Sequence, residues 1–261
     1  MTYLIFQDKN SEPFLKDRTA IVTGADGSIG SYLCEALLKN GAYVYGFYNK
    51  SKENINKLSR NYDKFTGISI DFLSEDYSQK INEIIKKIAR ERGSLDILIH
   101  SAGIFSMKPF LYEILEERKK VWRVNYETAV ELSNSFLRFG KREIDKSKHV
   151  IFIASLSGVR GTAQQIAYSN SKSALISLAQ GLAEEFGSSH DLCANVISPG
   201  AIPTKLLREF IPDLKAERLL AKSVPKYRLC SIEDVTNACL GILMNNFYNG
   251  ENFVLHGGKL P

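Results

Sequence analysis

The sequence has few cysteines, and their spacing does not suggest disulfide or metal-binding pairs. Four occur in 261 residues, none belongs to a CxxC pair, and three lie in apolar segments, where a small buried side chain is the usual role of a free thiol. This pattern argues against disulfides and against a metal site. We therefore expect reduced thiols and a cytoplasmic protein. The cysteines are Cys34, Cys193, Cys230 and Cys239.

A long apolar run is also missing from the start of the chain. MTYLIFQDKNSEPFLK has only a few apolar residues before charges appear, which is too short for a secretory signal or a membrane anchor. We expect residues 1–16 to be an extension of unknown purpose, and we expect no membrane association. A basic stripe is absent too, because 34 Lys and Arg are spread among 29 acids, so we expect no nucleic-acid partner.

What the sequence does contain is an even mixture of apolar and charged residues. Hydrophobic residues make up 44% of the chain and charged residues 24%, and no internal repeat or low-complexity linker divides it. These proportions are typical of a single globular domain with a sizeable core. We expect this domain to occupy residues 17–261.

Apolar runs rich in β-formers alternate with stretches of helical spacing. Nearly continuous apolar runs suit strands that are covered on both faces, and the alternation favours a doubly wound parallel sheet. The predicted fold is therefore α/β, a Rossmann-type sheet of about seven strands with helices on both faces. The expected strands are 19–23, 42–47, 65–70, 95–99, 149–155, 192–198 and 251–256, and the expected helices are 29–40, 75–91, 112–139, 163–186 and 232–244.

A glycine-rich turn follows the first expected strand. Thr23-Gly24-Ala25-Asp26-Gly27-Ser28-Ile29-Gly30 places small residues where a backbone must approach a pyrophosphate and where a helix begins with free N–H groups. A tight structural turn is the alternative reading. The position after strand one favours a dinucleotide site.

Tyr168 and Lys172 form the sequence YSNSK and share one helix face if 163–186 is helical. An ordinary tyrosine has a pKa near 10, and a fixed neighbouring cation lowers that pKa toward useful acid–base strength. Ser155 ends the fifth strand at the edge where open α/β sheets bind ligands. We expect its hydroxyl to hold a substrate carbonyl while Tyr168 transfers the proton. The competing reading, a serine that simply ends a strand, suits Ser157 better.

Asn125 lies in VWRVNYE, inside an expected helix. Asparagine is a poor residue there because its amide competes for backbone hydrogen bonds. Its presence therefore suggests a function.

These motifs occur in the order found in short-chain dehydrogenases/reductases, and the chain resembles that family from residue 17 to about 258. TGxxxGxG is matched except that Ser28 replaces the middle glycine, and His100-Ser101-Ala102-Gly103 resembles NNAG with both asparagines replaced. Ser198-Pro199-Gly200-Ala201-Ile202-Pro203-Thr204 resembles the PGxxxT segment. His100 is expected to be a strand-end histidine rather than a metal ligand.

The resemblance implies roles for the matching residues. Hydride would pass between a nicotinamide and a carbonyl or secondary alcohol, with Lys172 also holding the ribose and Asn125 supporting a water relay to Lys172. Asp71 would lie near the adenine, although a helix N-cap is an equal reading. The expected catalytic residues are Asn125, Ser155, Tyr168 and Lys172; the expected cofactor-binding residues are Gly24, Asp26, Ser28, Ile29, Tyr48, Asn49, Asp71, Phe72, Ser101, Ala102, Gly103, Asn125, Tyr168, Lys172, Pro199, Gly200, Ile202 and Thr204.

The end of the second strand bears on the choice between NADP(H) and NAD(H). After Tyr48 and Asn49 come two lysines, Lys50 and Lys52, and no acid before Glu53. An acid would bond the ribose 2′-OH of NAD, whereas a neutral or basic site admits the 2′-phosphate of NADP. NADP(H) is therefore expected, with NAD(H) as the alternative. The alternative interpretation is that both lysines are simply solvated residues of the loop.

The substrate is less well defined by the sequence. The SVPKYRL segment and the ending GENFVLHGG are similar to 3-oxoacyl-acyl-carrier-protein reductases, which implies acyl thioester substrates and an acyl-carrier protein as a partner. A pathway-specific dehydrogenase or ketoreductase acting on a free small molecule, and a catalytically idle nucleotide-binding scaffold, are the alternatives. Residues 200–228 are expected to cover the substrate. The resemblance also implies a homotetramer or homodimer built on the helices near 112–139 and 163–186.

Overall fold

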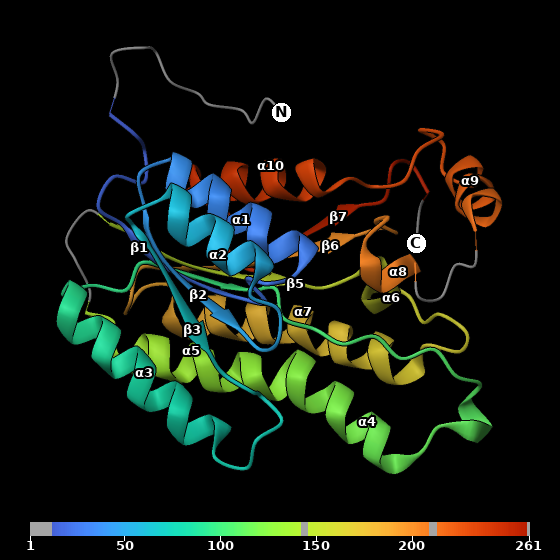
Figure 1. The fold of residues 1–261 in the computed structure, drawn as a ribbon, viewed down its shortest axis with the longest axis horizontal. Helices are drawn as coiled ribbons and strands as arrows, with labels where there is room; N and C mark the ends of the chain where they lie inside the picture. Colours follow the sequence, from blue (N-terminus) through green and yellow to red (C-terminus); the bar gives the residue numbers. More distant parts are fainter. Residues whose placement is uncertain (1–11, 142–145, 209–212, 260–261) are drawn as a thin grey trace.

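The computed structural model describes residues 12–141, 146–208 and 213–259. Its centre is one seven-stranded sheet in the order β3-β2-β1-β4-β5-β6-β7, with every neighbouring pair parallel (Figure 1). This confirms the predicted fold class. The strands are β1 (Thr19–Thr23), β2 (Tyr43–Tyr48), β3 (Phe65–Ser69), β4 (Ile97–His100), β5 (Lys148–Ile153), β6 (Leu192–Pro199) and β7 (Asn252–Leu255).

Helices cover both faces of the sheet, so the central strands are buried on both sides. Residues of α1, α2 and α10 share one core with one face, and residues of α3, α5 and α7 share a second core with the other (Figure 1). Every residue of β1, β4, β5 and β6 is buried, which explains their nearly continuous apolar runs. The helices are α1 (Ser28–Lys39), α2 (Glu53–Asn61), α3 (Tyr77–Arg92), α4 (Leu115–Trp122), α5 (Thr128–Phe139), α6 (Leu156–Val159), α7 (Ile166–Phe186), α8 (Lys205–Arg208), α9 (Leu214–Lys222) and α10 (Ile232–Leu243).

The helix expected over 112–139 is interrupted. A short 3-10 turn, η1 (Phe110–Tyr112), precedes α4, and a π-helical turn, η2 (Arg123–Glu127), joins α4 to α5. The side-chain amide of Asn125 pairs with the backbone of Ile104, with Oδ1 accepting its N–H at 2.8 Å and Nδ2 donating to its carbonyl at 3.1 Å. A side chain that bonds to a neighbouring segment in this way is a common cause of a local break in a helix.

The helix expected from residue 163 begins later, at Ile166. Gln164 has a φ of 64°, a left-handed conformation that a helix cannot contain. Its carbonyl accepts the N–H of Lys108 at 2.7 Å. The loop after β4 is thereby tied to the loop before α7.

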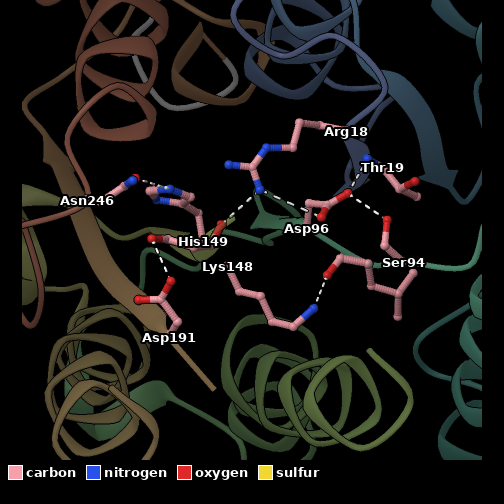
Figure 2. A network of polar contacts seen from close by, with 10 residues as sticks. Arg18, Thr19, Ser94, Asp96, Lys148, His149, Asp191 and Asn246 are labelled. Carbon is pink, nitrogen blue, oxygen red and sulfur yellow. Dashed lines mark hydrogen bonds and ion pairs between the residues drawn. The ribbon is translucent and has the colours of Figure 1, made fainter. Parts of the chain in front are cut away.

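A network of hydrogen bonds and an ion pair lies at the amino ends of the central strands (Figure 2). Asp96 accepts hydrogen bonds from the Thr19 N–H at 2.7 Å and the Ser94 hydroxyl at 3.0 Å, and its carboxylate lies 3.6 Å from Arg18. Lys148 is 2% exposed and donates to the Leu95 carbonyl. These contacts satisfy buried charges at the edge of the sheet away from the glycine-rich turn.

The first described residues pack against this domain. Leu15 is 2% exposed, lies in the core shared with α1, and donates its N–H to the Asn40 carbonyl at 3.0 Å. The expected extension over residues 1–16 therefore reaches into the packed domain at its end, while residues 1–11 lie outside the described residues. Among the helices that the structure describes, none has the length and apolarity needed to span a bilayer.

Candidate active site

A cavity of about 850 Å³ opens at the carboxyl edge of the sheet. This is the edge at which open α/β sheets bind ligands. Its walls come from the ends of β5, β6 and β7, the loops after β4 and β5, the start of α7 and the segment containing α8 and α9. Three expected catalytic residues, Ser155, Tyr168 and Lys172, line it.

The start of α7 places two of these residues. Tyr168 and Lys172 lie one turn apart on this helix, and the Lys172 ammonium is 5.9 Å from the centre of the Tyr168 ring. Phe105 packs edge-on against the same ring, with 4.8 Å between centroids. Lys172 is 4% exposed and donates to the Ile153 carbonyl at 2.8 Å. The bond to Ile153 therefore holds the ammonium near the Tyr168 ring.

Ser155 lies just beyond the end of β5 and caps α6. Its Oγ accepts the Ser157 N–H at 3.1 Å. The serine hydroxyl also bonds to Tyr168, an interaction that lowers the pKa of that phenol. The bond from Ser157 orients Ser155, while Ser157 itself bonds to Gln165 and Thr162. Both serines therefore have defined positions on the cavity wall.

The pKa of Tyr168 is shifted by burial and by a hydrogen bond. Burial raises it above the usual value near 10, and the bond from Ser155 opposes that rise. Burial also lowers the pKa of Lys172, to about 8. Burial and Ser155 are the two influences on the Tyr168 pKa here, so the effect of Lys172 on that pKa stays a prediction.

Asn125 is not among the residues that line the cavity, but it bonds to chain neighbours of residues that do. Besides its two bonds to Ile104, its Nδ2 donates to the Ser171 hydroxyl at 2.9 Å, one residue before Lys172. Gly103 closes the space between them. A Cβ at Gly103 would lie 3.2 Å from Lys172 Nζ and 3.4 Å from Asn125 Oδ1. Asn125 and Lys172 therefore face each other across a glycine.

The glycine-rich turn leads into an uncapped helix. Gly24 has a φ of 67°, and a Cβ on Gly30 would lie 2.1 Å from the Gly24 carbonyl oxygen, so both positions require glycine. No side chain caps α1, and its first turn holds no acid. Its first N–H groups are therefore available to an anion, and the cradle fits the pyrophosphate of a dinucleotide. Ser28 begins α1, and Ile29, the next residue, lines the cavity.

The loop after β1 brings the carboxylate of Asp26, one of the expected cofactor-binding residues, to the end of β2. Asp26 Oδ2 accepts the N–H groups of Lys50 at 3.4 Å and Ser51 at 3.3 Å. Tyr48, at the end of β2, packs against the core beside α1 and α2, and Asn49 follows it. Asp26 was expected to bind the cofactor, but the prediction of NADP(H) counted acids only along the loop after β2 and left Asp26 out of that choice.

Asp71 and Phe72 follow β3. Asp71 Oδ1 accepts the Leu73 N–H at 2.9 Å and lies 3.5 Å from Asn49 Nδ2. The N-cap of α3 is Asp76, so Asp71 stabilises a turn and does not cap that helix. Phe72 is 7% exposed and belongs to the core.

The remaining expected cofactor residues lie at the ends of β4 and β6. Ser101 and Gly103 line the cavity, whereas Ala102 is buried behind them. Gly200 donates its N–H to the Leu255 carbonyl at 3.0 Å, which fixes the segment after β6 against β7. The cavity-lining residues between Pro199 and Thr204 are Pro199, Gly200, Ala201, Ile202 and Thr204.

Several cavity residues were missed in the sequence. They come from segments with no motif of their own, and only the C-terminal HGG pattern gave a signal. Gln165 lies three residues before Tyr168, and Cys230 follows the expected substrate loop. The missed lining residues include Phe105, Met107, Gln165, Cys230, His256, Gly257 and Lys259, whereas Leu207, Leu220 and Val224 belong to residues 200–228, which were expected to cover the substrate. Among the residues that the structure describes, no cluster of metal-ligand type occurs.

The model of the short chain dehydrogenase family matches residues 18–215. The chain therefore belongs to this family. Its members are oxidoreductases that act on CH–OH and C=O groups with a nicotinamide cofactor, and this chain is such an oxidoreductase.

Two relatives among known proteins match nearly the whole chain. The 3-oxoacyl-acyl-carrier-protein reductase FabG of Escherichia coli (strain K12) is 29% identical over 245 residues, which cover 92% of this chain and 96% of that one. The acetoacetyl-CoA reductase of Acinetobacter sp. (strain RA3849) is 25% identical over 247 residues, covering 93% and 98%.

Solved structures show the same fold at lower identity. The aldohexose dehydrogenase of Thermoplasma acidophilum superposes with a TM-score of 0.83 at 22% identity, covering 95% of this chain and 96% of that one. A proposed NAD(P)-dependent gluconate 5-dehydrogenase from Beutenbergia cavernae, with NADP bound at low occupancy, gives 0.84 at 24% identity, covering 95% and 99%.

Proposed function

We propose that this protein is an NADPH-dependent reductase of 3-oxoacyl thioesters. The observation that carries the proposal is the convergence of Ser155, Tyr168 and Lys172 on one cavity, with Asn125 holding the residue before Lys172. The names of the two relatives, a 3-oxoacyl-acyl-carrier-protein reductase and an acetoacetyl-CoA reductase, support the thioester substrate. The cavity volume of about 850 Å³ is in the range of sites that enclose a cofactor end and a small substrate.

In this proposal the bound nicotinamide supplies a hydride to the carbonyl carbon. Ser155 donates a hydrogen bond to the carbonyl oxygen, which can only accept, while the Ser157 N–H orients the Ser155 hydroxyl. The Tyr168 hydroxyl gives its proton to the same oxygen. Its raised pKa keeps the phenol protonated at neutral pH, which is the state that a proton donor requires.

Lys172 and Asn125 assist Tyr168, the proton donor, in different ways. The Lys172 ammonium, held by the Ile153 carbonyl, stabilises negative charge that develops on the Tyr168 oxygen. Asn125 maintains the distance between the loop after β4 and α7 by bonding to both Ile104 and Ser171. A water relay from Asn125 to Lys172 is part of the proposal, and it would return a proton to Tyr168 after each cycle.

We propose NADP(H) as the preferred cofactor. Lys50 and Lys52 are exposed at the end of β2, and neither forms an ion pair with a described residue. The carboxylate of Asp26 opposes this preference, but it accepts two backbone N–H groups, which disperse its charge. The remaining expected residues, Gly24, Ser28, Tyr48, Asn49 and Asp71, would frame the adenosine half.

The test is oxidation of NADPH and of NADH by purified protein with β-ketoacyl thioesters, free or on acyl-carrier protein, and with simple ketones. Thioester reduction that is lost in Tyr168→Phe is the expected result. Activity limited to free ketones or alcohols would replace the thioester proposal with a small-molecule dehydrogenase. Cofactor binding without turnover on any substrate would contradict the proposed activity and favour an idle scaffold.

We also propose a homotetramer or homodimer. Large apolar side chains are exposed on η1 and α4, among them Leu111 at 88%, Tyr112 at 74% and Trp122 at 37% exposure, and such patches often mark an interface. The acyl-carrier protein would approach the basic side chains of Lys141 and Arg160, whereas Arg142 lies outside the described residues. Light scattering coupled to gel filtration tests the assembly, and a monomer at micromolar concentration would contradict it.

A further inference from the structure

The cavity at the carboxyl edge is far more basic than the chain as a whole. Its lining holds five cationic side chains and one acidic side chain, whereas the whole chain has 34 Lys and Arg against 29 acids. A cleft lined by one sign of charge concentrates ligands of the opposite sign. The cations are Arg160, Lys172, Lys226, Arg228 and Lys259, and the acid is Asp234.

The one acid is already matched. Asp234 accepts bonds from both terminal nitrogens of Arg228 and from the Ser231 N–H at 2.8 Å, so this pair belongs to the start of α10. Lys172 is held by the Ile153 carbonyl and serves Tyr168. Within the part of the chain that the structure describes, the other three cations of the cavity form no ion pair with a carboxylate. Their charge is therefore left for a ligand.

The fold brings two of these cations together on one wall of the cavity. Lys259 Nζ donates to Ser223 Oγ at 2.9 Å. Lys226 donates its backbone N–H to the Gly257 carbonyl at 3.2 Å, and a Cβ on Gly257 would lie only 3.8 Å from the Cβ of Lys226. The segment after α9 and the segment after β7 thus lie against each other, and each contributes one lysine to the lining.

The phosphates of a dinucleotide do not account for this wall. Their expected cradle is the glycine-rich turn and the start of α1, and of Gly24, Asp26, Ser28 and Ile29 only Ile29 lines the cavity. Lys226 and Lys259 instead adjoin the segment 200–228 that is expected to cover the substrate. Their charge therefore faces the substrate end of the site.

We propose that Lys226 and Lys259 determine substrate specificity by binding an oxyanion of the substrate, either a phosphate or a carboxylate. Ammonium groups bind such oxygens through charge-assisted hydrogen bonds, and the bond to Ser223 holds the Lys259 ammonium in place for this purpose. A thioester on a phosphopantetheine arm would supply a phosphate, and a free keto acid would supply a carboxylate. The inference rests on the proposed function, because it names the substrate class of that site.

The kinetic test uses two pairs of probes that differ in one anionic group. The first pair is acetoacetyl-4′-phosphopantetheine and acetoacetyl-pantetheine, and the second is acetoacetate and methyl acetoacetate, each with NADPH. We expect kcat/KM to be about tenfold higher for the charged member of one pair. Replacing both lysines, in Lys226→Met with Lys259→Met, should remove that preference. Preference within the first pair identifies a phosphopantetheine thioester as the substrate class, and preference within the second identifies a free acid.

The matched control is Lys222→Met. Lys222 ends α9, one residue before Ser223, and does not line the cavity, so its loss should leave the preference for the charged probe unchanged. Lys259→Arg keeps the charge and should retain most of the preference. The proposal is overturned if neither pair shows a preference, if the preference survives the double replacement, or if Lys222→Met removes it equally.

Binding tests the site without turnover. In calorimetry with the full-length protein and NADP⁺, 4′-phosphopantetheine or acetoacetate should bind about tenfold more tightly than pantetheine or methyl acetoacetate, and the double replacement should abolish the difference. Equal binding within both pairs would overturn the inference. If the wild-type protein binds a charged probe in this way but reduces none of the probes, the proposed reductase activity fails while the anion site stands.

Discussion

Two buried lysines at opposite edges of the sheet each donate to a backbone carbonyl, but their roles differ. Lys148 donates to the Leu95 carbonyl at the amino edge, and Lys172 donates to the Ile153 carbonyl near the carboxyl edge. Only Lys172 lines a cavity. At the amino edge the charges of Arg18 and Asp96 are matched within the network of Figure 2.

The difference teaches that burial of a charge does not by itself identify a catalytic residue. At the amino edge, the charged groups of Arg18, Asp96 and Lys148 bond to neighbouring protein groups and stabilise the ends of the strands. At the carboxyl edge, the Ser155 and Tyr168 hydroxyls keep bonding capacity that faces the cavity. Access to a ligand separates the two lysines.

The largest effect is expected for Tyr168→Phe. The ring and its contact with Phe105 remain, but the proton donor is gone, so kcat should fall by about 10²- to 10⁴-fold. Cofactor affinity, measured by NADPH fluorescence, should change little. Activity near the wild-type level would show that Tyr168 is not the proton donor.

The lysine pair gives the next largest effect when both are replaced by methionine. Lys172→Met should lose about 10²-fold or more in kcat, since charge on the Tyr168 oxygen is no longer stabilised. Lys148→Met should keep kcat but lower the free energy of unfolding by about 1–3 kcal/mol, because the Leu95 carbonyl loses its buried donor. Kinetics and urea unfolding of both variants check this. A loss of kcat in Lys148→Met would contradict the purely structural role assigned to Lys148.

The pH profile of reduction should also report Lys172. Its pKa of about 8 means that the ammonium is lost as the pH rises through that value, while the raised pKa of Tyr168 keeps the phenol protonated there. We expect kcat/KM for reduction to fall about tenfold per pH unit above pH 8. Replacing Lys172 with arginine, which stays charged, should remove this limb. A limb retained in that variant would assign it to another group.

The smallest effect is expected at the end of β2. Tyr48→Asp should lower the ratio of NADPH to NADH activity by about tenfold, since a carboxylate there repels a 2′-phosphate and bonds a 2′-OH. The matched change Asp26→Asn should raise the ratio. Ratios of kcat/KM for the two cofactors measure both effects. An unchanged ratio in Tyr48→Asp would place the adenosine ribose elsewhere.

Much of the fold could be predicted because its signals are local. The strands β1 and β6 fall within a residue of their apolar runs, and Tyr168 and Lys172 share a helix face as their spacing requires. The break at Asn125 could not be located, because it depends on Ile104, a residue 21 positions away in the sequence. Nor could Asp26 be placed beside Lys50, since that contact depends on how two loops meet.

The cavity wall was predicted least well. Leu207, Leu220 and Val224 lie in the segment 200–228 that was expected to cover the substrate, but the sequence did not indicate which residues of this segment line the cavity. The left-handed Gln164 was also invisible, because a residue other than glycine adopts that conformation only when its surroundings impose it.

The π-helical turn has a consequence for helical phase. A π-turn adds one residue to the path of an α-helix, and each residue advances the phase by about 100° at 3.6 residues per turn. The stripe that α4 presents and the stripe that α5 packs against the sheet are therefore out of step by that angle. Deleting a single residue between Arg123 and Glu127 would restore one continuous phase and turn α4, with the loop before it, around the helix axis.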